Sequence, residues 1–431
     1  MSERDLVAVL GFVALFAMML VRVPVGIAMG VVGVTGFAAV VGWGPALNLL
    51  ASSPIRTVTD YNLSLVPMFI LMGVLATNSG LSRELFRAGN AWLGRFRGGL
   101  ALATIGACAG FAAICGSSVA TAATMTNIAL PEMKRFGYPD DVSTGVIAAG
   151  GTLGILIPPS VVLAVYAFIT NQDVGKLFIA GIVPGILAII FYMVTVQLVH
   201  GRRLPSGEKV SIGERLASLR GVWAVALLFV AIIGGIYAGV VTPTEAAAAG
   251  AALTALIGIL RGRLGPKALV SSLAEALRTS VSIYMILIGA LLFGYFLTIT
   301  QTPQKITAFL VGLDLGAYPT LALILVFFLL LGCILDAMAM IILLVPIVFP
   351  VVQQLGFDPI WFGVIVVMTV ELGLITPPVG MNVFVINSIT PKISLYQIYK
   401  GVMPFVLIDI IRLILLVAFP AIVLFLPRTM Q

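Results

Sequence analysis

The chain has 431 residues, of which 61% are apolar and only 10% are charged, and its mean hydropathy is +1.17. A soluble domain of this length cannot bury so much apolar surface, so the composition predicts an all-α polytopic membrane protein. The net charge of +7 does not indicate nucleic acid, because the basic residues stand singly or in pairs at the ends of apolar runs. We therefore expect a lipid bilayer around the chain and no nucleic acid.

The apolar runs number about ten, and several approach the roughly 20 residues that a helix needs to cross the hydrocarbon layer. The first run, residues 6–21, resembles a signal peptide in length. Two acidic residues, Glu3 and Asp5, precede it, however, and no small-residue cleavage site follows. We interpret this run as the first membrane span.

The second run, residues 24–42, carries Gly26, Gly30 and Gly33. This small-residue spacing lets two helices approach closely, so we expect tight helix packing there. After a further span, residues 81–96 mix charged residues with large apolar ones, a pattern typical of a helix that lies along the membrane surface.

Two apolar pieces, residues 100–114 and 119–130, are each too short to cross the membrane comfortably. The polar sequence Gly116-Ser117-Ser118 joins them. A re-entrant helical hairpin whose tip stops at mid-membrane fits this pattern, and we place it at about residues 100–131.

The next apolar segment, residues 142–170, contains Gly154 and the pair Pro158-Pro159. Two successive prolines cannot continue a regular helix, so we predict two half-helices with an unwound joint. A further span completes a first unit of residues 1–200.

The second half of the chain repeats the first. A shift of 219 residues carries Pro131 to Pro350, Gly154 to Gly373 and Pro158-Pro159 to Pro377-Pro378. We predict a cytoplasmic linker at residues 201–221 and a second repeat at 222–431. Within that repeat we expect a span at 282–297, a second hairpin at about 320–350 and a second broken helix at about 361–389.

The distribution of basic residues predicts the topology. If the amino terminus is periplasmic and both hairpins are re-entrant, most Lys and Arg residues become cytoplasmic, including Arg202 and Lys209 of the linker. The two repeats are then inverted with respect to each other, which is a transporter architecture. The basic residues left outside are Arg4, Arg56, Lys176, Lys305 and Arg428.

Hairpin tips and broken helices bring several helix ends to the middle of the membrane. Their carbonyl and hydroxyl groups suit Na⁺, and their unpaired N–H groups suit a carboxylate. The candidate Na⁺ ligands are Ser117, Ser118, Thr121, Gly154 and Pro158 in the first repeat, and Asp336, Ala339, Gly373, Thr376 and Gly380 in the second. The candidate substrate-binding residues are Ser117, Ser160, Asp336, Pro377 and Asn382.

Three further ionisable residues fall in apolar runs. Asp409 and Arg412 are three residues apart on one predicted span and are interpreted as an internal ion pair. Glu371 pairs with a scaffold residue or takes part in the site, and its role is left open.

The sequence contains no phosphate-binding loop for ATP, no cluster of His, Cys and Asp, and no nucleophile with a matching base. An enzyme is therefore not expected, and transport must draw on an ion gradient. The three cysteines lie inside apolar runs and are interpreted as packing residues: Cys108, Cys115 and Cys333.

The chain resembles a known family, the large membrane (DctM-like) subunit of tripartite ATP-independent periplasmic (TRAP) transporters. The resemblance covers nearly the whole chain. It rests on the motifs Gly116-Ser-Ser-Val-Ala-Thr121, Leu130-Pro-Glu-Met133, Gly154 to Ser160, and Thr376-Pro-Pro-Val-Gly-Met-Asn382.

The resemblance implies a bacterial inner-membrane protein in which an elevator-type transport domain moves against a scaffold. It also implies Na⁺ as the coupling ion, a separate small four-span membrane subunit, and a periplasmic substrate-binding protein that delivers an organic acid (a carboxylate). The alternatives are a stand-alone ion-coupled carboxylate transporter of the same superfamily, a channel, and a membrane-embedded enzyme such as an acyltransferase.

Overall fold

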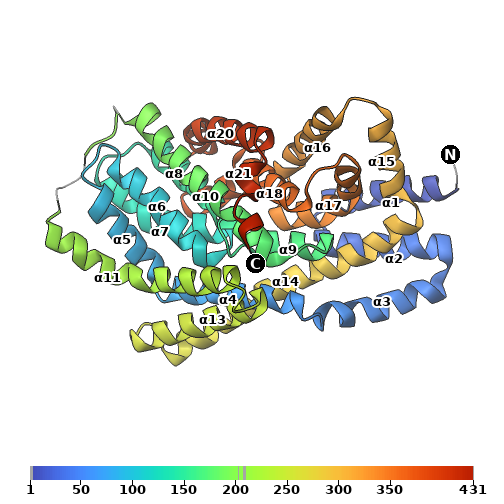
Figure 1. Ribbon diagram of the computed structural model, residues 1–431, viewed down its shortest axis with the longest axis horizontal. Coiled ribbons are helices and arrows are strands. Elements are labelled where there is room, and N and C mark those ends of the chain that lie inside the picture. The colour runs from blue at the N-terminus through green and yellow to red at the C-terminus, as the bar shows by residue number, and fades with distance from the viewer. Residues whose placement is uncertain (1–2, 202, 207–209, 431) are drawn as a thin grey trace.

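The computed structural model describes residues 3–201, 203–206 and 210–430, so Arg202 and Lys209 lie outside the described residues. Within these ranges the chain forms helices and no β-strand; one isolated bridge pairs Arg97 with Ser206. The all-helical class predicted from the composition is therefore confirmed (Figure 1).

Helices of the first half of the chain are α1 (Glu3–Leu20), α2 (Val25–Val41), α3 (Trp43–Val58), α4 (Leu65–Asn78), α5 (Leu81–Leu93), α6 (Gly99–Cys115), α7 (Ser118–Arg135), α8 (Asp140–Leu156), α9 (Val161–Thr170) and α10 (Val174–Thr195). The second half contains α11 (Ile212–Phe229), α12 (Gly235–Tyr237), α13 (Pro243–Leu260), α14 (Pro266–Ile299), α15 (Thr302–Gly312), α16 (Ala317–Gly332), α17 (Ala337–Gln354), α18 (Pro359–Ile375), α19 (Met381–Ile389), α20 (Leu395–Ala418) and α21 (Ala421–Leu424).

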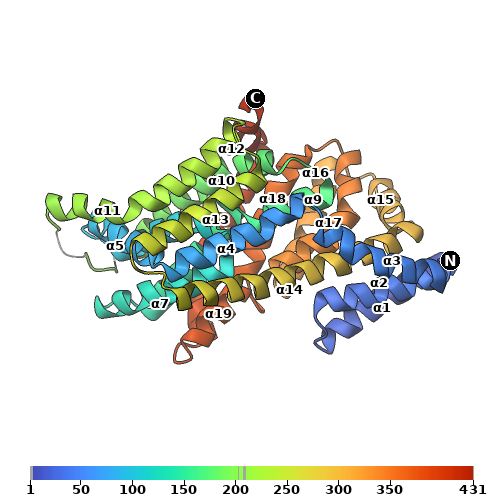
Figure 2. The ribbon, with the colours of Figure 1, turned by 90° about the horizontal axis from the view of Figure 1, so that it is seen from below.

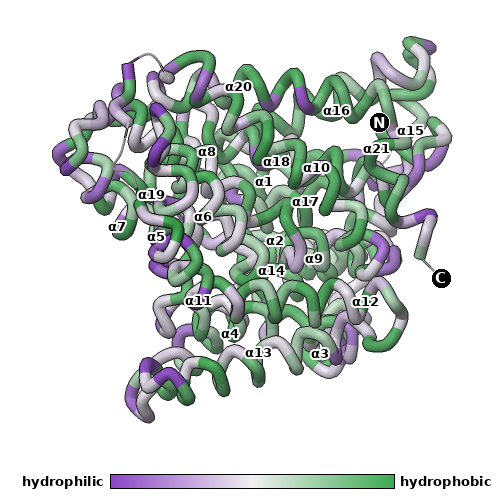
Figure 3. Tube along the Cα trace, turned by 60° about the vertical axis from the view of Figure 1, so that its left-hand side comes forward, coloured by the Kyte–Doolittle hydropathy of each residue, from purple (hydrophilic) through white to green (hydrophobic). Residues whose placement is uncertain are grey.

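Seven helical segments in the described chain are long and apolar enough to cross a membrane, or eight if the bent pair α3 and α4 forms one span. Figure 3 shows hydrophobic residues along most of the helices and hydrophilic residues mainly at helix ends and in loops. The apolar arms α6, α16 and α18 are shorter, at 17, 16 and 17 residues. Short apolar arms fit hairpins and broken helices better than complete spans.

The helix bounds repeat with the same shift as the sequence. A shift of 219 residues carries the bounds of α7 onto those of α17, and the bounds of α8 onto those of α18. In each half a broken helix follows a hairpin, with joints at residues 157–160 and 376–380.

The repeat departs from its own pattern at one place. In the first half, α3 and α4 are separate helices bent by 60°. In the turn between them Asp60 accepts a hydrogen bond from the Asn62 N–H (2.8 Å), a local contact that competes with helix formation. In the second half, the 34-residue helix α14 is continuous. The expected span at 282–297 was therefore too short: no proline interrupts the chain between Pro266 and Ile299.

Helix α11 also begins earlier than the predicted linker boundary. Ser211 and Glu214 form a reciprocal capping box, which starts the helix at Ile212 inside the stretch expected to be a linker.

The two halves pack against each other reciprocally. Helix α2 lies along α14, and its counterpart α13 lies along α4 (Figures 1 and 2). In the same way α7 contacts α19, and α17 contacts α9. Each hairpin thus packs on the broken helix of the other half, so that neither half is complete without its partner.

Glycine permits the closest of these helix crossings. A Cβ atom on Gly26 would lie 2.7 Å from the Ile286 Cα atom, and one on Gly33 would lie 2.5 Å from the Leu292 carbonyl carbon. A Cβ atom on Gly289 would collide with the Gly26 carbonyl group. The tight packing predicted for α2 is therefore confirmed, with α14 as its partner.

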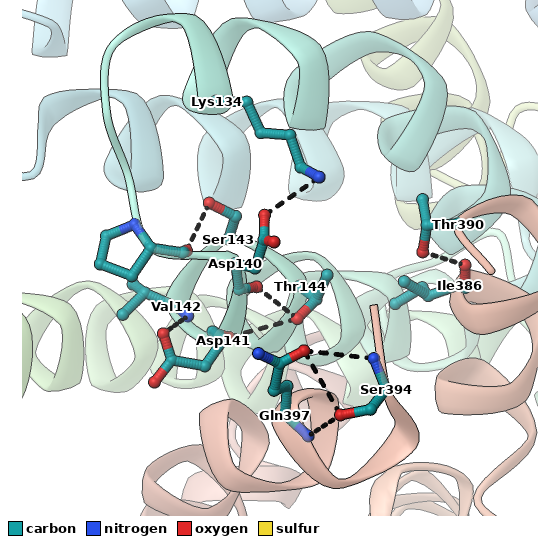
Figure 4. A network of polar contacts seen from close by, with 11 residues as sticks. Lys134, Asp140, Asp141, Val142, Ser143, Thr144, Ile386, Thr390, Ser394 and Gln397 are labelled. Carbon is teal, nitrogen blue, oxygen red and sulfur yellow. Dashed lines mark hydrogen bonds and ion pairs between the residues drawn. The ribbon is translucent and has the colours of Figure 1, made fainter. Parts of the chain in front are cut away.

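The start of α8 lies beside α20, where the Asp141 carbonyl leaves no room for a side chain on Gly401. Polar groups gather around these helix ends (Figure 4). Lys134 pairs with Asp140 (3.1 Å) across the turn before α8, and Ser394 with Gln397 forms the capping box of α20. The capping box satisfies backbone groups that the start of α20 leaves free.

A buried charge cluster ties together the helices that carry the joints. The Arg412 Nη2 atom lies 3.0 Å from Glu371 and 2.9 Å from Asp409, and all three side chains are inaccessible to solvent. The Tyr192 hydroxyl donates to Asp409 (2.5 Å) and lies 3.1 Å from the Thr152 hydroxyl. The ion pair predicted between Asp409 and Arg412 is present, and Glu371 joins it.

We expect Gly289→Ala to destabilise the protein, because the added methyl group must separate α14 from α2. Overpacking of this kind costs about 1 to 3 kcal/mol. Thermal unfolding in detergent, followed by size-exclusion chromatography with fluorescence detection, measures the effect. Gly294→Ala is the matched control on the same helix, where nothing lies within 4 Å of the added atom. Equal midpoints for the two variants would contradict the close crossing.

We expect Arg412→Met to destabilise the protein by about 3 to 5 kcal/mol, because two buried carboxylates then lose their counter-charge. Replacing all three charges together, with Glu371→Gln and Asp409→Asn added, should restore most of the lost stability. The same thermal measurement distinguishes the two cases. A triple variant as unstable as the single one would show that the cluster stabilises by something other than charge compensation.

Candidate functional site

A cavity of about 370 Å³ lies between the two hairpin tips. Residues 115–120 of the first tip and 336–338 of the second form part of its wall. Helices α4 and α14 close it from the side, through residues that include Gly73 and Thr279. Residues of both tips therefore line one cavity.

Four helices begin at this cavity. Its wall includes the first residues of α7, α9, α17 and α19, which are Ser118, Val161, Ala337 and Met381. A helix start exposes N–H groups without intrahelical partners and carries a partial positive charge. The cavity is therefore a place where an anionic group finds hydrogen-bond donors from both halves of the chain.

Three of the four starts are capped by the residue that precedes them. Ser117 accepts a hydrogen bond from the Ala120 N–H (3.3 Å), and Ser160 accepts one from the Leu163 N–H (3.2 Å). The Asp336 Oδ1 atom accepts from the N–H groups of residues 338 and 339 at 2.9 and 3.1 Å. Helix α19 begins after Gly380, which offers no side chain as a cap. Asp336 thus caps α17 with one oxygen and keeps Oδ2 for another partner.

The first tip is pressed against the first joint. A Cβ atom on Gly154 would lie 2.7 Å from the Ser117 carbonyl carbon and 2.8 Å from the Thr121 hydroxyl. The Thr121 hydroxyl donates to the Ser117 carbonyl (2.7 Å). Gly116, at a φ of +64°, approaches the Pro159 carbonyl, 2.7 Å from where its Cβ would stand. Three predicted Na⁺ ligands, Ser117, Thr121 and Gly154, therefore lie together.

The second tip meets the second joint in the same manner. A Cβ atom on Gly373 would lie 2.7 Å from the Gly332 backbone, and the Gly380 N–H donates to the Cys333 carbonyl (3.3 Å). The Thr376 carbonyl lies 3.1 Å from a Cβ atom built on Gly380. Both proline pairs at the joints have a cis peptide bond. The joints are unwound, as predicted, and each packs against the adjoining tip.

Two hydrogen bonds of Asn382 join the two halves behind the cavity wall. The Ser118 hydroxyl donates to the Asn382 Oδ1 atom (2.7 Å), and the Asn382 amide donates to the Ala148 carbonyl (3.3 Å). Both side chains are buried. Asn382 therefore connects the second broken helix to the first hairpin and to α8.

Of the predicted site residues, Ser117, Ser118 and Asp336 line the cavity. The others support the tips and joints and do not form its wall. Ser160, for example, donates to the Ile155 carbonyl and caps α9. The residues away from the wall are Thr121, Gly154, Pro158, Ser160, Ala339, Gly373, Thr376, Pro377, Gly380 and Asn382.

Sequence reasoning missed the contribution of α14. Glu275 and Thr279 of this helix line the cavity, opposite residues of the tips. Glu275 is the only acidic residue between Pro266 and Ile299, and a lone acid in a long apolar helix is a signal that could have identified it.

The cavity wall carries two carboxylates, Asp336 and Glu275, and no lysine or arginine. Carboxylate, hydroxyl and carbonyl oxygens favour a cation, whereas the helix starts favour an anion. The arrangement can therefore hold a cation and an anion in the same cavity. Each ion then lowers the free energy that is needed to bring the other out of water.

The chain is similar in sequence to known transport proteins. The family described as "Tripartite ATP-independent periplasmic transporter, DctM component" matches residues 12–422. The C4-dicarboxylate TRAP transporter large permease protein DctM of Pseudomonas aeruginosa is 40% identical over 404 residues, covering 92% of this chain and 93% of that protein. The isethionate TRAP transporter permease protein DctMQ of Oleidesulfovibrio alaskensis is 35% identical and covers 96% of this chain, while 65% of its own length is matched.

Among solved structures, the YdaH transporter of Alcanivorax borkumensis resembles the fold, with a TM-score of 0.65 at 16% sequence identity. The match covers 88% of this chain and 89% of that one. At this identity the likeness concerns the fold alone. The family match and the sequence identity together show that the chain is a membrane transporter permease and not an enzyme, and that it belongs to the DctM family of TRAP transporter large permease subunits.

Proposed function

We propose that the chain is the substrate-translocating subunit of a secondary active TRAP transporter that imports an organic acid together with Na⁺. The observation that carries the proposal is the convergence of four helix starts and two carboxylates on one cavity. The helix starts supply donors for a carboxylate, and Asp336 with the tip carbonyls supplies oxygen ligands for Na⁺. The cavity volume of about 370 Å³ is within the range of small-molecule sites.

The identity of relatives supports a small organic anion as the class of substrate. One relative is named for C4-dicarboxylates and another for isethionate, and each is an organic acid with an anionic head group. A C4-dicarboxylate is our first choice, since that relative is 40% identical. One carboxylate of such a substrate would bind at the helix starts of the first half, and the other would bind at the helix starts of the second half.

We propose a small membrane subunit and a periplasmic binding protein as partners, in the inner membrane and with a periplasmic amino terminus. The name and greater length of the DctMQ relative support a second membrane segment beside the matched one. In an elevator mechanism, the hairpins and broken helices would move as a unit against α2, α4, α13 and α14. The reciprocal packing of these four helices suits a scaffold.

The role of Asp336 is tested by Asp336→Asn, which keeps an N-cap but removes the charge. We expect Na⁺-driven uptake of succinate to fall at least about tenfold, or the Na⁺ concentration for half-maximal uptake to rise by a similar factor, equivalent to roughly 1.4 kcal/mol of lost ion binding. Uptake is measured in proteoliposomes that contain the chain with its small subunit and binding protein.

Asp358→Asn is the matched control, because Asp358 caps α18 with the same geometry, at 2.8 and 3.1 Å, away from the cavity. This control should transport like the unchanged protein. Normal Na⁺ dependence in Asp336→Asn would remove Asp336 from the ion site.

The alternative, a stand-alone ion-coupled carrier, is tested by omission. We expect proteoliposomes with the chain alone to show no Na⁺-driven succinate uptake above protein-free liposomes, and uptake to appear when both partners are added. Uptake by the chain alone, at a rate unaffected by the binding protein, would favour the alternative.

A further inference from the structure

A second hollow, of about 630 Å³, adjoins the central cavity. Thr77 of α4 and Thr124 of α7 line both spaces, so they stand at the junction. The second hollow continues into a third of about 410 Å³, with which it shares Arg83, Arg87 and Asn127. We call these two outer hollows together the vestibule of the central cavity.

The vestibule and the central cavity differ in charge. In the described part of the chain, the central cavity is lined by Asp336 and Glu275 and by no basic residue. The vestibule is lined by three arginines, Arg83, Arg87 and Arg263, and by two glutamates, Glu84 and Glu132, so its wall carries more positive than negative charge. The vestibule is therefore positively charged, whereas the central cavity that it leads to is negatively charged.

Two of the arginines in the vestibule are not neutralised. Glu84 pairs with Arg263 (2.7 Å) and with Arg261 (2.6 Å), so the single carboxylate between α5 and the α13–α14 turn is already shared. Arg83 and Arg87 form no ion pair with any carboxylate in the described part of the chain. The vestibule thus keeps two free positive charges.

A rigid helix presents these two charges. Arg83 and Arg87 are four residues apart, on the same face of α5, and both are exposed. Other residues of α5, such as Leu85 and Phe86, are buried where the helix packs on α6 and α11. A basic residue can set the membrane topology from any position on the cytoplasmic surface. Arg83 and Arg87, in contrast, line both outer hollows.

We propose that the vestibule concentrates organic anions at the mouth of the central cavity, with Arg83 and Arg87 as the groups that attract them. This inference rests on the proposed function for the identity of the anion as a carboxylate substrate. Charged clefts raise the local concentration of an oppositely charged solute by about 10-fold to 1,000-fold. An imported anion that has passed Asp336 and Glu275 meets Arg83 and Arg87 at the side predicted to be cytoplasmic, where their charges favour its exit from the central cavity.

The experiment measures the electrostatic potential at the junction directly. A single reporter, Thr124→Cys, is introduced into the full chain after Cys108, Cys115 and Cys333 are each replaced by alanine. In lipid nanodiscs, the reporter is modified with the negatively charged sulfonatoethyl and the positively charged trimethylammonioethyl methanethiosulfonate. The ratio of the two rates, divided by the ratio for a free thiol, reports the local charge.

We expect Arg83→Gln with Arg87→Gln to lower this anion-to-cation ratio about fivefold or more, since each reagent feels the loss of both charges. Arg83→Lys with Arg87→Lys should keep the ratio. Arg95→Gln with Arg97→Gln is the matched control, because these arginines carry the same charge but do not line the vestibule.

An unchanged ratio in the Arg83 and Arg87 glutamine variant, or an equal fall in the Arg95 and Arg97 variant, would overturn the proposal. Each single glutamine variant, which changes the fold less, should give part of the effect and serves if the double variant does not fold. The measurement needs neither transport nor a known substrate. Its failure is therefore separate from a failure of the proposed function, which the uptake experiments test.

Discussion

The structure depends on satisfying the backbone N–H and carbonyl groups of helices that end inside apolar surroundings. A helix that stops in the membrane leaves N–H and carbonyl groups without partners, and each costs free energy unless something satisfies it. Here each hairpin tip stops against a joint, and glycines such as Gly154 and Gly373 let backbone meet backbone without side chains between them. The donors left over at the starts of α7, α9, α17 and α19 open onto one cavity. The cost of breaking the helices is thus offset in part by mutual contacts and in part, we propose, by ligands.

Reciprocal packing makes the two halves interdependent. The hydrogen bond from Ser118 to Asn382 joins the first hairpin to the second broken helix, while α17 of the second hairpin packs on α9 of the first half. The buried cluster around Arg412 links α8, α10, α18 and α20 behind the joints. A cavity built in this way combines an acidic wall with helix starts, and it opens to a vestibule of opposite charge. Such a path suits a solute that travels with a cation.

Much of this arrangement follows from sequence because prolines and glycines mark where helices must break. The repeated proline pairs located both joints. Gly116-Ser117-Ser118 located the first tip, and the 219-residue repeat located the second hairpin. The sequence predicted helix ends less well where no proline or glycine interrupts a helix. The continuous α14 was predicted too short, and Glu275 on it was missed as part of the wall. Several polar candidates, among them Ser160 and Thr121, bond to nearby carbonyls. Spacing along the chain alone could not separate the residues that face the cavity from those that hold the tips.

The most direct test of a site shared between the halves is a disulfide between Ser118→Cys and Asn382→Cys in a chain without its three native cysteines. A protease site inserted between residues 200 and 211 then separates the halves. After mild oxidation and cleavage, the two fragments should remain joined on a non-reducing gel and separate on reduction. The control pair, Ser118→Cys with Asn387→Cys, uses the far end of the same helix and should not cross-link. Fragments that separate in the Ser118 and Asn382 pair, or that stay joined equally in the control, would contradict a site built from both halves.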